Sequence, residues 1–294
     1  MFTLPHEINA LAQGNPRALY ALLFQSVSDT LIEFGANPRW LGGKLAATLV
    51  LHTWGQTLSQ HLHLHALVAA GALHPDGHWI TARRGFLFPV KALSRVFRGK
   101  FIAGLTRLFQ TSSLTLAGSC AALATPCAQR RLIHALYEKP WVVYAKRPFA
   151  GPAQVLDYLG RYTHRVAITN HRLVSLTEDA VRFRYKDYAH GNRHKVMTLT
   201  CAEFIRRFLL HVLPAGFMRI RHYGVLANRA KRVKLAQARA VLDAPSSTGP
   251  LQAESVEAFW QRVAGRDIHQ CPRCKTGRMQ VFAPIQPARA RAPP

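Results

Sequence analysis

Acidic residues are scarce in this chain of 294 residues, which holds 14 Asp and Glu against 39 Lys and Arg and has a formal net charge of +25. Self-repulsion makes such an imbalance costly for a folded protein, and a polyanionic partner would neutralise it. Nucleic acid is therefore the expected partner. The same scarcity disfavours a nuclease built on a cluster of carboxylates, although a few carboxylates would suffice for one such site.

Long apolar runs and cysteines are also scarce. No stretch reaches the roughly 18 apolar residues that a membrane-spanning helix requires. The N-terminal MFTLPHEINA does not have the basic-then-apolar layout of a signal peptide. Five cysteines are too few and too scattered for a disulfide framework. Hydrophobic residues make up 49% of the chain, which excludes a disordered protein. Because neither a membrane-spanning helix nor a signal peptide is predicted, we expect a soluble, cytoplasmic protein with no membrane partner.

Hydrophobic periodicity predicts both helices and strands. The predicted helices cover residues 15–35, 89–110, 151–165, 200–213 and 224–243, and the predicted strands cover 44–54, 61–73 and 141–146, with further short strands between 165 and 199. Asn15 is the expected cap of the first helix. Because these helices and strands do not alternate regularly as in βαβ units, they indicate an α+β fold with an antiparallel sheet flanked by helices. The stretch APSSTGPLQAES divides the chain into a domain over 1–243 and a linker with a C-terminal tail over 244–294.

Three histidines alternate with leucine in HLHLHALVA, residues 61–69. Because the side chains of a strand alternate between its faces, His61, His63 and His65 share one face while the leucines can pack into a core. Neutral imidazole is the commonest metal ligand, and two imidazoles about 7 Å apart along a strand can reach one ion if their rings tilt inward. The pattern predicts a metal site, and a polar strand face in contact with solvent is the alternative.

Two tyrosines lie four residues apart in YLGRYTHR, residues 158–165, so Tyr158 and Tyr162 share one face of the predicted helix. Aromatic residues at this spacing usually belong to a core, but Arg161 and Arg165 are poor neighbours for a buried face. A free tyrosine, with a pKa of about 10, is a weak nucleophile at neutral pH. Nearby cations favour the phenolate, which is suited to attack a phosphodiester polarised by a divalent metal ion.

The alternating histidines and the tyrosine pair resemble sequence motifs of known nucleases. HLH at 63–65 is similar to the His-hydrophobe-His motif of HUH endonucleases, and YLGRYTHRVAI resembles the two-tyrosine transposases of the rolling-circle insertion-sequence class. Further blocks match in order over roughly residues 2–240: FTLPHE (2–7), LHTWGQ (51–56), HPDGHWI (74–80), WVVYAK (141–146) and KDYAHGNRHKVMTL (186–199). The resemblance implies an antiparallel sheet that carries the histidines, with the tyrosine helix beside it. Relatives of this class carry a cysteine-rich zinc-binding segment before the FTLPHE block, which this chain is expected to lack.

The resemblance also implies a function. We expect a DNA transposase of the bacterial nucleoid that nicks single-stranded DNA and joins transposon ends to target DNA. A tyrosine attacks a phosphodiester, leaves a 5′-phosphotyrosine and frees a 3′-OH, and a second tyrosine allows a second strand transfer. By this resemblance Tyr158 and Tyr162 are the nucleophiles, and His63 and His65 bind Mg²⁺ or Mn²⁺. The third metal ligand stays open between His61, Gln56 and Gln154.

The remaining motifs concern DNA contacts and zinc. KDYAHGNRHK (186–195) indicates a basic hairpin loop that contacts phosphates, with a solvated turn as the alternative. CPRC at 271–274 has the spacing of half a zinc ribbon, so Cys271 and Cys274 are candidate Zn²⁺ ligands and His269 a candidate third ligand. The residues expected to bind DNA are Arg161, Arg165, Lys186, Arg193 and Lys195.

Two rival functions belong to other classes. The first is an inactive, transposase-derived remnant that only binds DNA, which a nicking assay would distinguish from an active enzyme. The second is a zinc hydrolase that uses the histidine cluster on small substrates. That second function leaves the net positive charge and the tyrosine pair unexplained.

Overall fold

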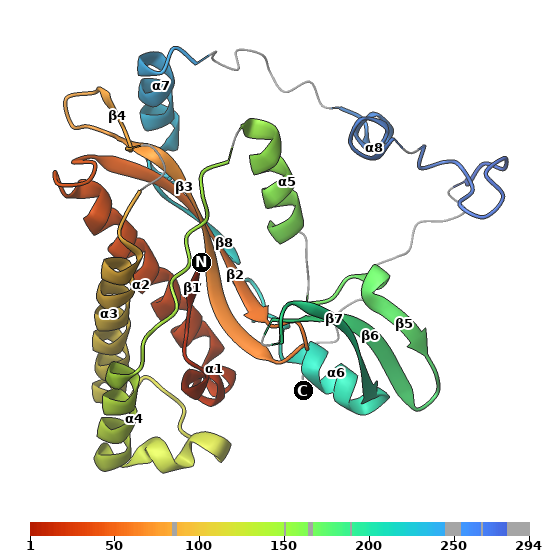
Figure 1. Ribbon diagram of the computed structural model, residues 1–294, viewed down its shortest axis with the longest axis horizontal. Coiled ribbons are helices and arrows are strands. Elements are labelled where there is room, and N and C mark those ends of the chain that lie inside the picture. Colours follow the sequence, from red (N-terminus) through yellow and green to blue (C-terminus); the bar gives the residue numbers. More distant parts are fainter. Residues whose placement is uncertain are drawn as a thin grey trace, which may run out of the picture. The chain divides into compact units, whose positions relative to one another are not determined.

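Five antiparallel strands form the main sheet of the computed structural model, in the order β1–β3–β2–β8 with β4 paired to β3 (Figure 1). These strands are β1 (Phe2–Thr3), β2 (Lys44–Trp54), β3 (Gln60–Leu73), β4 (Trp79–Thr81) and β8 (Ile220–Gly224). The structure describes residues 1–83, 87–149, 151–163, 167–188, 190–244, 254–265 and 267–280. They belong to two compact units, Met1–Ala244 and Pro245–Pro294, and each unit is described by itself.

Helices bury one face of the main sheet (Figure 1). Leu49 and Leu51 of β2 and Leu64 of β3 are fully buried in one core with Phe97 and Phe101. Because alternate side chains point to opposite faces, the other face of β2 and β3 carries the histidines. The elements on the core side are η1 (His6–Ile8), α1 (Asn9–Gly14), α2 (Pro16–Ala36), α3 (Val90–Gln110), η2 (Gly118–Ala124) and α4 (Pro126–Glu138).

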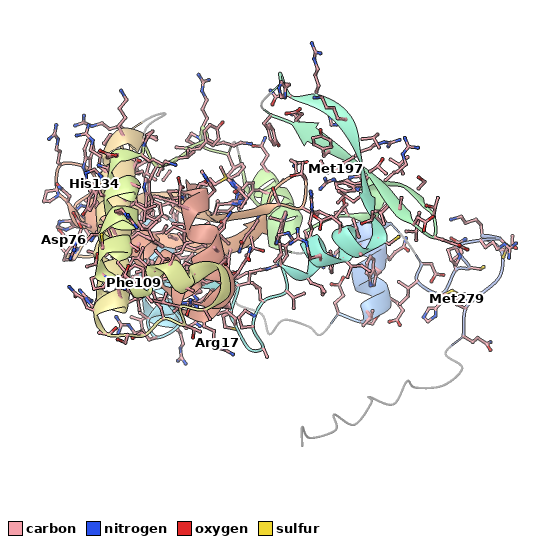
Figure 2. All side chains as sticks on the ribbon, turned by 90° about the horizontal axis from the view of Figure 1, so that it is seen from below. Arg17, Asp76, Phe109, His134, Met197 and Met279 are labelled. Atoms are coloured by element: carbon pink, nitrogen blue, oxygen red, sulfur yellow. The ribbon has the colours of Figure 1, made fainter. Side chains whose placement is uncertain are left out.

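A second, three-stranded antiparallel sheet is formed by β5 (Leu173–Leu176), β6 (Ala180–Asp187) and β7 (Arg193–Thr200), which follow η3 (Asn170–Arg172). The helix α6 (Cys201–Leu209) covers one face of this sheet. Phe183, Phe204 and Met197, the last labelled in Figure 2, pack there against Leu58 of the β2–β3 turn. The second sheet is thereby attached to the turn of the histidine hairpin.

Three further helices complete the described chain. α5 (Pro152–Thr163) precedes the second sheet, and α7 (Lys231–Val241) packs through Ala238 against Leu73 and Val225. In the second unit, α8 (Val256–Ala264) is capped by Ser255, whose hydroxyl accepts from the backbone N–H of Ala258 at 3.2 Å. None of the described helices is both long and apolar enough to cross a membrane.

The predicted α+β class, with antiparallel sheets flanked by helices, is confirmed, and so are the strands predicted over 44–54 and 61–73. Three local predictions are wrong. Residues 141–146 form no strand, because only Val143 bridges to Phe2. The helix expected over 224–243 begins at Lys231, because Ile220–Gly224 pairs with β2 as β8. Residues 167–169, where another short strand was expected, have no regular structure.

Asn15 does not cap α2 as the sequence predicts. Its side-chain amide instead donates to the carbonyl oxygen of Thr115 at 2.9 Å, and its side-chain oxygen accepts from the N–H of Thr115 at 2.6 Å. The side chain therefore holds the loop after α3 against the start of α2. A tertiary contact has replaced the local capping bond, and both groups remain hydrogen-bonded.

Candidate metal centre and nucleophile

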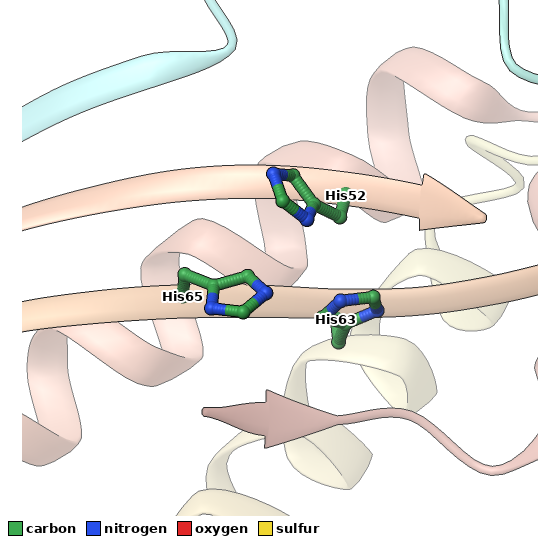
Figure 3. A group of neighbouring side chains, drawn as sticks. All are labelled: His52, His63 and His65. Atoms are coloured by element: carbon green, nitrogen blue, oxygen red, sulfur yellow. The ribbon is translucent and has the colours of Figure 1, made fainter. Parts of the chain in front are cut away.

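Three imidazoles converge on the face of the main sheet opposite the core (Figure 3). In the β2–β3 pairing, His52 lies directly opposite His63, and His65 is the next residue on the same face of β3. One ring nitrogen from each of the three lies within 4.8 Å of the others. The ring centroids are separated by 5.4 Å for His52–His63, 4.5 Å for His52–His65 and 5.0 Å for His63–His65.

His52 is the residue that sequence reasoning missed. It is buried, and its ring stacks on Trp54 at a centroid distance of 4.5 Å. Both features hold the imidazole in place beside His63 and His65. In the sequence, His52 is marked only by lying two residues before Trp54 in a predicted strand, which puts the two side chains on the same face. That face can be matched to the histidines of β3 only when the register of the β2–β3 pairing is known.

The orientation of His63 is fixed by the backbone. Its Nδ1 lies 2.8 Å from the carbonyl oxygen of His61, and because a carbonyl can only accept, Nδ1 carries the hydrogen. The lone pair of the neutral ring is then on Nε2. Metal-ligating histidines are commonly oriented in this way, by a hydrogen bond from the ring nitrogen that does not bind the metal ion.

The imidazoles of His63 and His65 are neutral at neutral pH. Burial lowers the pKa of His63 to about 3, and the nearby His61 and His52 add to the effect. Burial likewise lowers the pKa of His65 to about 2, with further contributions from His52 and His63. Neutral imidazole is the form that binds metal ions, so His63 and His65 are prepared to act as nitrogen ligands.

The tyrosine helix brings a hydroxyl to this cluster. The Tyr158 hydroxyl oxygen lies 2.9 Å from Nδ1 of His65, although the two residues are 93 positions apart in the chain. The Tyr158 ring also contacts Phe149, with centroids 5.1 Å apart. A neutral His65 carries its hydrogen on one ring nitrogen, so with the hydrogen on Nδ1 the ring donates to the tyrosine oxygen and Nε2 keeps the lone pair. That tautomer favours developing negative charge on the oxygen.

Two of the three candidates for the third ligand, His61 and Gln56, lie apart from the cluster, and Gln154 stays a candidate. His61 is exposed and contributes no nitrogen to the cluster, although its ring centroid is 4.9 Å from that of His63. The side-chain oxygen of Gln56 accepts from the backbone N–H of Lys186 at 3.4 Å, so it is directed at β6. Gln154 is an exposed residue of α5, one turn before Tyr158. Of the predicted residues, the structure brings together His63, His65 and Tyr158, and His52 joins them.

Part of the predicted site lies outside the described residues. This holds for Arg165 and for the side chains of Arg161 and Tyr162, whose backbone belongs to α5. Of the three cations predicted in the β6–β7 hairpin, Lys195 forms an ion pair with Asp187, at 2.8 Å between Nζ and Oδ2. Arg193 is exposed, and the ammonium of Lys186 lies 5.4 Å from the ring centroid of Tyr188.

A second cluster of metal-ligand types lies in the turn between β3 and β4. Oδ1 of Asp76 is 2.7 Å from Nδ1 of His74 and 2.6 Å from Nδ1 of His78, and it also accepts from the N–H of His78 at 3.3 Å. Asp76 and His78 are exposed. These contacts close the turn by themselves, so the cluster has a structural role that the buried histidines of β2 and β3 do not share.

The cysteine pair of the second unit forms a tight loop. The N–H of Gly277 donates to Sγ of Cys274 at 3.2 Å, and the N–H of Cys271 donates to the carbonyl oxygen of Gly277 at 2.8 Å. Hydrogen bonds from the loop backbone lower the pKa of Cys274 to about 6. His269 lies by Glu257, with Nε2 3.5 Å from Oε1. In the described part of this unit, no three metal-ligand side chains come together.

With this fold and site, the chain belongs to a transposase family: a family model described as "Putative transposase" matches residues 46–234. It is similar to "Putative transposase y4qJ" of Sinorhizobium fredii (strain NBRC 101917 / NGR234), with 49% identity over 283 residues, which cover 95% of this chain and 71% of that relative. It is also similar to "Transposase for insertion sequence element IS801" of Pseudomonas savastanoi pv. phaseolicola, with 32% identity over 231 residues, which cover 78% of this chain and 54% of that relative. No solved structure matches the chain. The family expected from the sequence motifs is confirmed.

Proposed function

We propose that this transposase nicks single-stranded DNA and transfers the cut strand through a covalent tyrosine intermediate. The observation that carries the proposal is the 2.9 Å contact between the Tyr158 hydroxyl and His65, which brings a tyrosine hydroxyl to the edge of the cluster of three imidazoles. The alternative of a zinc hydrolase acting on small molecules leaves the pair of tyrosines on α5 unexplained. The net charge of +25 suits a DNA substrate.

The donor set fits a divalent metal ion, with His52, His63 and His65 as its ligands. All three donors are imidazole nitrogens, and their separations of at most 4.8 Å allow them to share one ion. An all-nitrogen set favours a transition ion over Mg²⁺, which prefers oxygen ligands, and Mn²⁺ is the transition ion chosen for the tests below. A bound ion would act as a Lewis acid that polarises a phosphate oxygen.

The residues of the chain account for the rest of the reaction. The Tyr158 oxygen attacks phosphorus and loses its proton to solvent, while His65 Nδ1–H donates to that oxygen and orients it. The bond from phosphorus to the 3′-oxygen breaks, and this oxygen takes up a proton from water. The products are a 5′-phosphotyrosine and a free 3′-OH. Tyr162, one helical turn further along α5, is the proposed second nucleophile for strand transfer.

A covalent-adduct assay tests this proposal. Single-stranded oligonucleotides of random sequence, labelled at the 3′ end, are incubated with the protein and Mn²⁺ and run on a denaturing gel. The labelled fragment should migrate with the protein, because the 5′-phosphate of that fragment is the group joined to tyrosine. The Tyr158→Phe/Tyr162→Phe double variant keeps both rings and should form no adduct.

The histidine ligands are tested in the same assay. His52→Ala should abolish the adduct by weakening metal binding, whereas the matched control His78→Ala, which removes an imidazole from the β3–β4 turn, should leave it unchanged. Equal loss in both variants would show that these substitutions act through general destabilisation. A covalent band that persists in the double Phe variant would assign the nucleophile elsewhere and refute the proposal.

A further inference from the structure

The two faces of the β5–β7 sheet differ sharply in chemistry. Strand alternation puts Phe183 and Tyr185 of β6 toward α6, where they pack with the helix. The alternate residues Arg182, Arg184 and Lys186 therefore lie on the opposite face, which no helix covers in the described part of this unit. Figure 1 shows α6 on one side of this sheet only.

Among the residues that the structure describes, the outer face of β6 and β7 carries cations and no carboxylate. The partners of Arg182, Arg184 and Lys186 across β7 are Thr198, Val196 and His194. Arg182 and Arg184 are exposed, and among the described residues neither forms an ion pair. Successive outward residues of a strand are about 7 Å apart. The result is a row of three evenly spaced cations, which matches the regular negative charge of an extended polynucleotide backbone.

An aromatic ring stands at the end of this row. Tyr188 directly follows β6 and is 64% exposed, and the ammonium of Lys186 lies 5.4 Å from its ring centroid. An exposed aromatic side chain beside phosphate-binding cations is the usual combination for binding unpaired nucleotides, since a free base can stack on the ring. A base inside a duplex has both faces covered and cannot stack in this way.

The same end of β6 meets the histidine hairpin. The backbone N–H of Lys186 contacts Gln56 at 3.4 Å, and the guanidinium of Arg207 donates to the carbonyl oxygen of Thr57 at 3.0 Å. Both of these partners belong to the β2–β3 turn. His63 is three residues into β3 from Gln60, a distance of about 10 Å along the strand. The row of cations therefore ends next to the hairpin that carries the imidazoles.

We propose that the outer face of β6 is a binding site for single-stranded DNA, which Arg182, Arg184 and Lys186 hold by its phosphates and Tyr188 by a base. The role of this site in leading the strand to His63 and His65 rests on the proposed nicking function. Binding itself does not, because it needs neither a metal ion nor a nucleophile. The site shares Lys186 with the expected hairpin-loop contacts but adds Arg182 and Arg184, and it leaves out Lys195, which is paired with Asp187 on the other face.

Two charge-matched variants test this site. Arg182→Gln/Arg184→Gln removes two exposed cations from β6, and the control Arg130→Gln/Arg131→Gln removes two exposed cations from α4. Affinity for fluorescent oligo(dT) is measured by anisotropy in EDTA at several salt concentrations. Each phosphate contact on a single strand contributes about 0.7 to the slope of log K against log salt, so the β6 variant should lose about 1.4 while the control keeps its slope.

Two further variants separate charge from folding and from stacking. Arg182→Lys/Arg184→Lys retains both charges and should keep the salt slope. Tyr188→Ala should weaken binding at least about fivefold through lost stacking without changing the slope. Pairing the probe with oligo(dA) should remove the effect of Tyr188→Ala.

Equal loss of slope in the β6 and α4 variants would mean that net charge alone binds DNA, and the site would be refuted. An effect of Tyr188→Ala that persists on the duplex would also refute it. Because this assay contains EDTA and measures no adduct, a failure of the nicking proposal leaves its result unchanged. Conversely, adduct formation by a β6 variant with unaltered binding would support nicking and refute the site.

Discussion

The affinity of the histidine centre for Mn²⁺ should fall by at most about tenfold when the pH is lowered from about 7.5 to about 5.5. Protons compete with the metal for an imidazole nitrogen only near its pKa. An imidazole with the ordinary pKa of about 6.5 loses about tenfold in metal affinity over this interval, and two such imidazoles lose about 100-fold. His63 and His65, with pKa values of about 3 and about 2, remain unprotonated and contribute no loss.

The expected fall is therefore at most about tenfold, the loss that one remaining imidazole would contribute. Isothermal titration with Mn²⁺ measures it, in a His78→Ala background that disables the cluster in the β3–β4 turn. His52→Ala in the same background should remove the binding heat. A fall of about 100-fold or more would refute the reasoning, because it would mean that His63 and His65 titrate as ordinary imidazoles.

The lowered pKa values of His63 and His65 also limit the pH range over which the titration can be run. Both pKa values are lower in the folded protein than in the unfolded chain, so the unfolded chain binds more protons below about pH 6.5. The metal-free protein should therefore lose stability progressively as the pH falls from about 6.5 toward about 3. Circular dichroism at each pH verifies that the protein titrated is folded.

Two predictions concern the fold and are measured by urea denaturation. Phe97→Ala should lower the free energy of unfolding by about 3–5 kcal/mol, because Phe97 is fully buried against other aromatic rings, and a change below about 1 kcal/mol would contradict that packing. Gly224→Ala should destabilise more than the control Gly216→Ala. Both glycines have positive φ, but a Cβ on Gly224 would lie only 1.8 Å from the carbonyl oxygen of Leu45, whereas one on Gly216 meets no atom within 4 Å. Equal effects would refute the clash.

The sequence could predict the features that depend on local pattern. Alternation in HLHLH fixes which side chains share a face, whatever the strand pairs with, and so His63 and His65 were identified as neighbours. The class of fold followed in the same way from the periods of the apolar residues. Asn15 shows the limit of such reasoning, because the same side chain can cap a helix or bind a distant loop, and its preference is decided by Thr115.

The third imidazole was beyond local pattern. His52 reaches the cluster because the hairpin register pairs it with His63, and a slip of one residue would have put it on the core face. No residue near His52 in the sequence reveals that register. The register of the β2–β3 pairing also shifts between positions His52 and Trp54 of β2, and a prediction that assumes a regular hairpin would not include this shift.

The amino-acid sequence by itself determined the transposase family, the α+β class, the histidine face of β3 and the spacing of the tyrosines on α5. These depend on residue identity and on backbone periods that each segment carries alone. Only the tertiary structure decided that the Tyr158 hydroxyl meets His65, that His52 completes the cluster and that β6 turns a row of cations outward beside the histidine hairpin. The physical reason is that these contacts join residues far apart in the chain, and they form only where packing of the apolar faces fixes strand register and helix position.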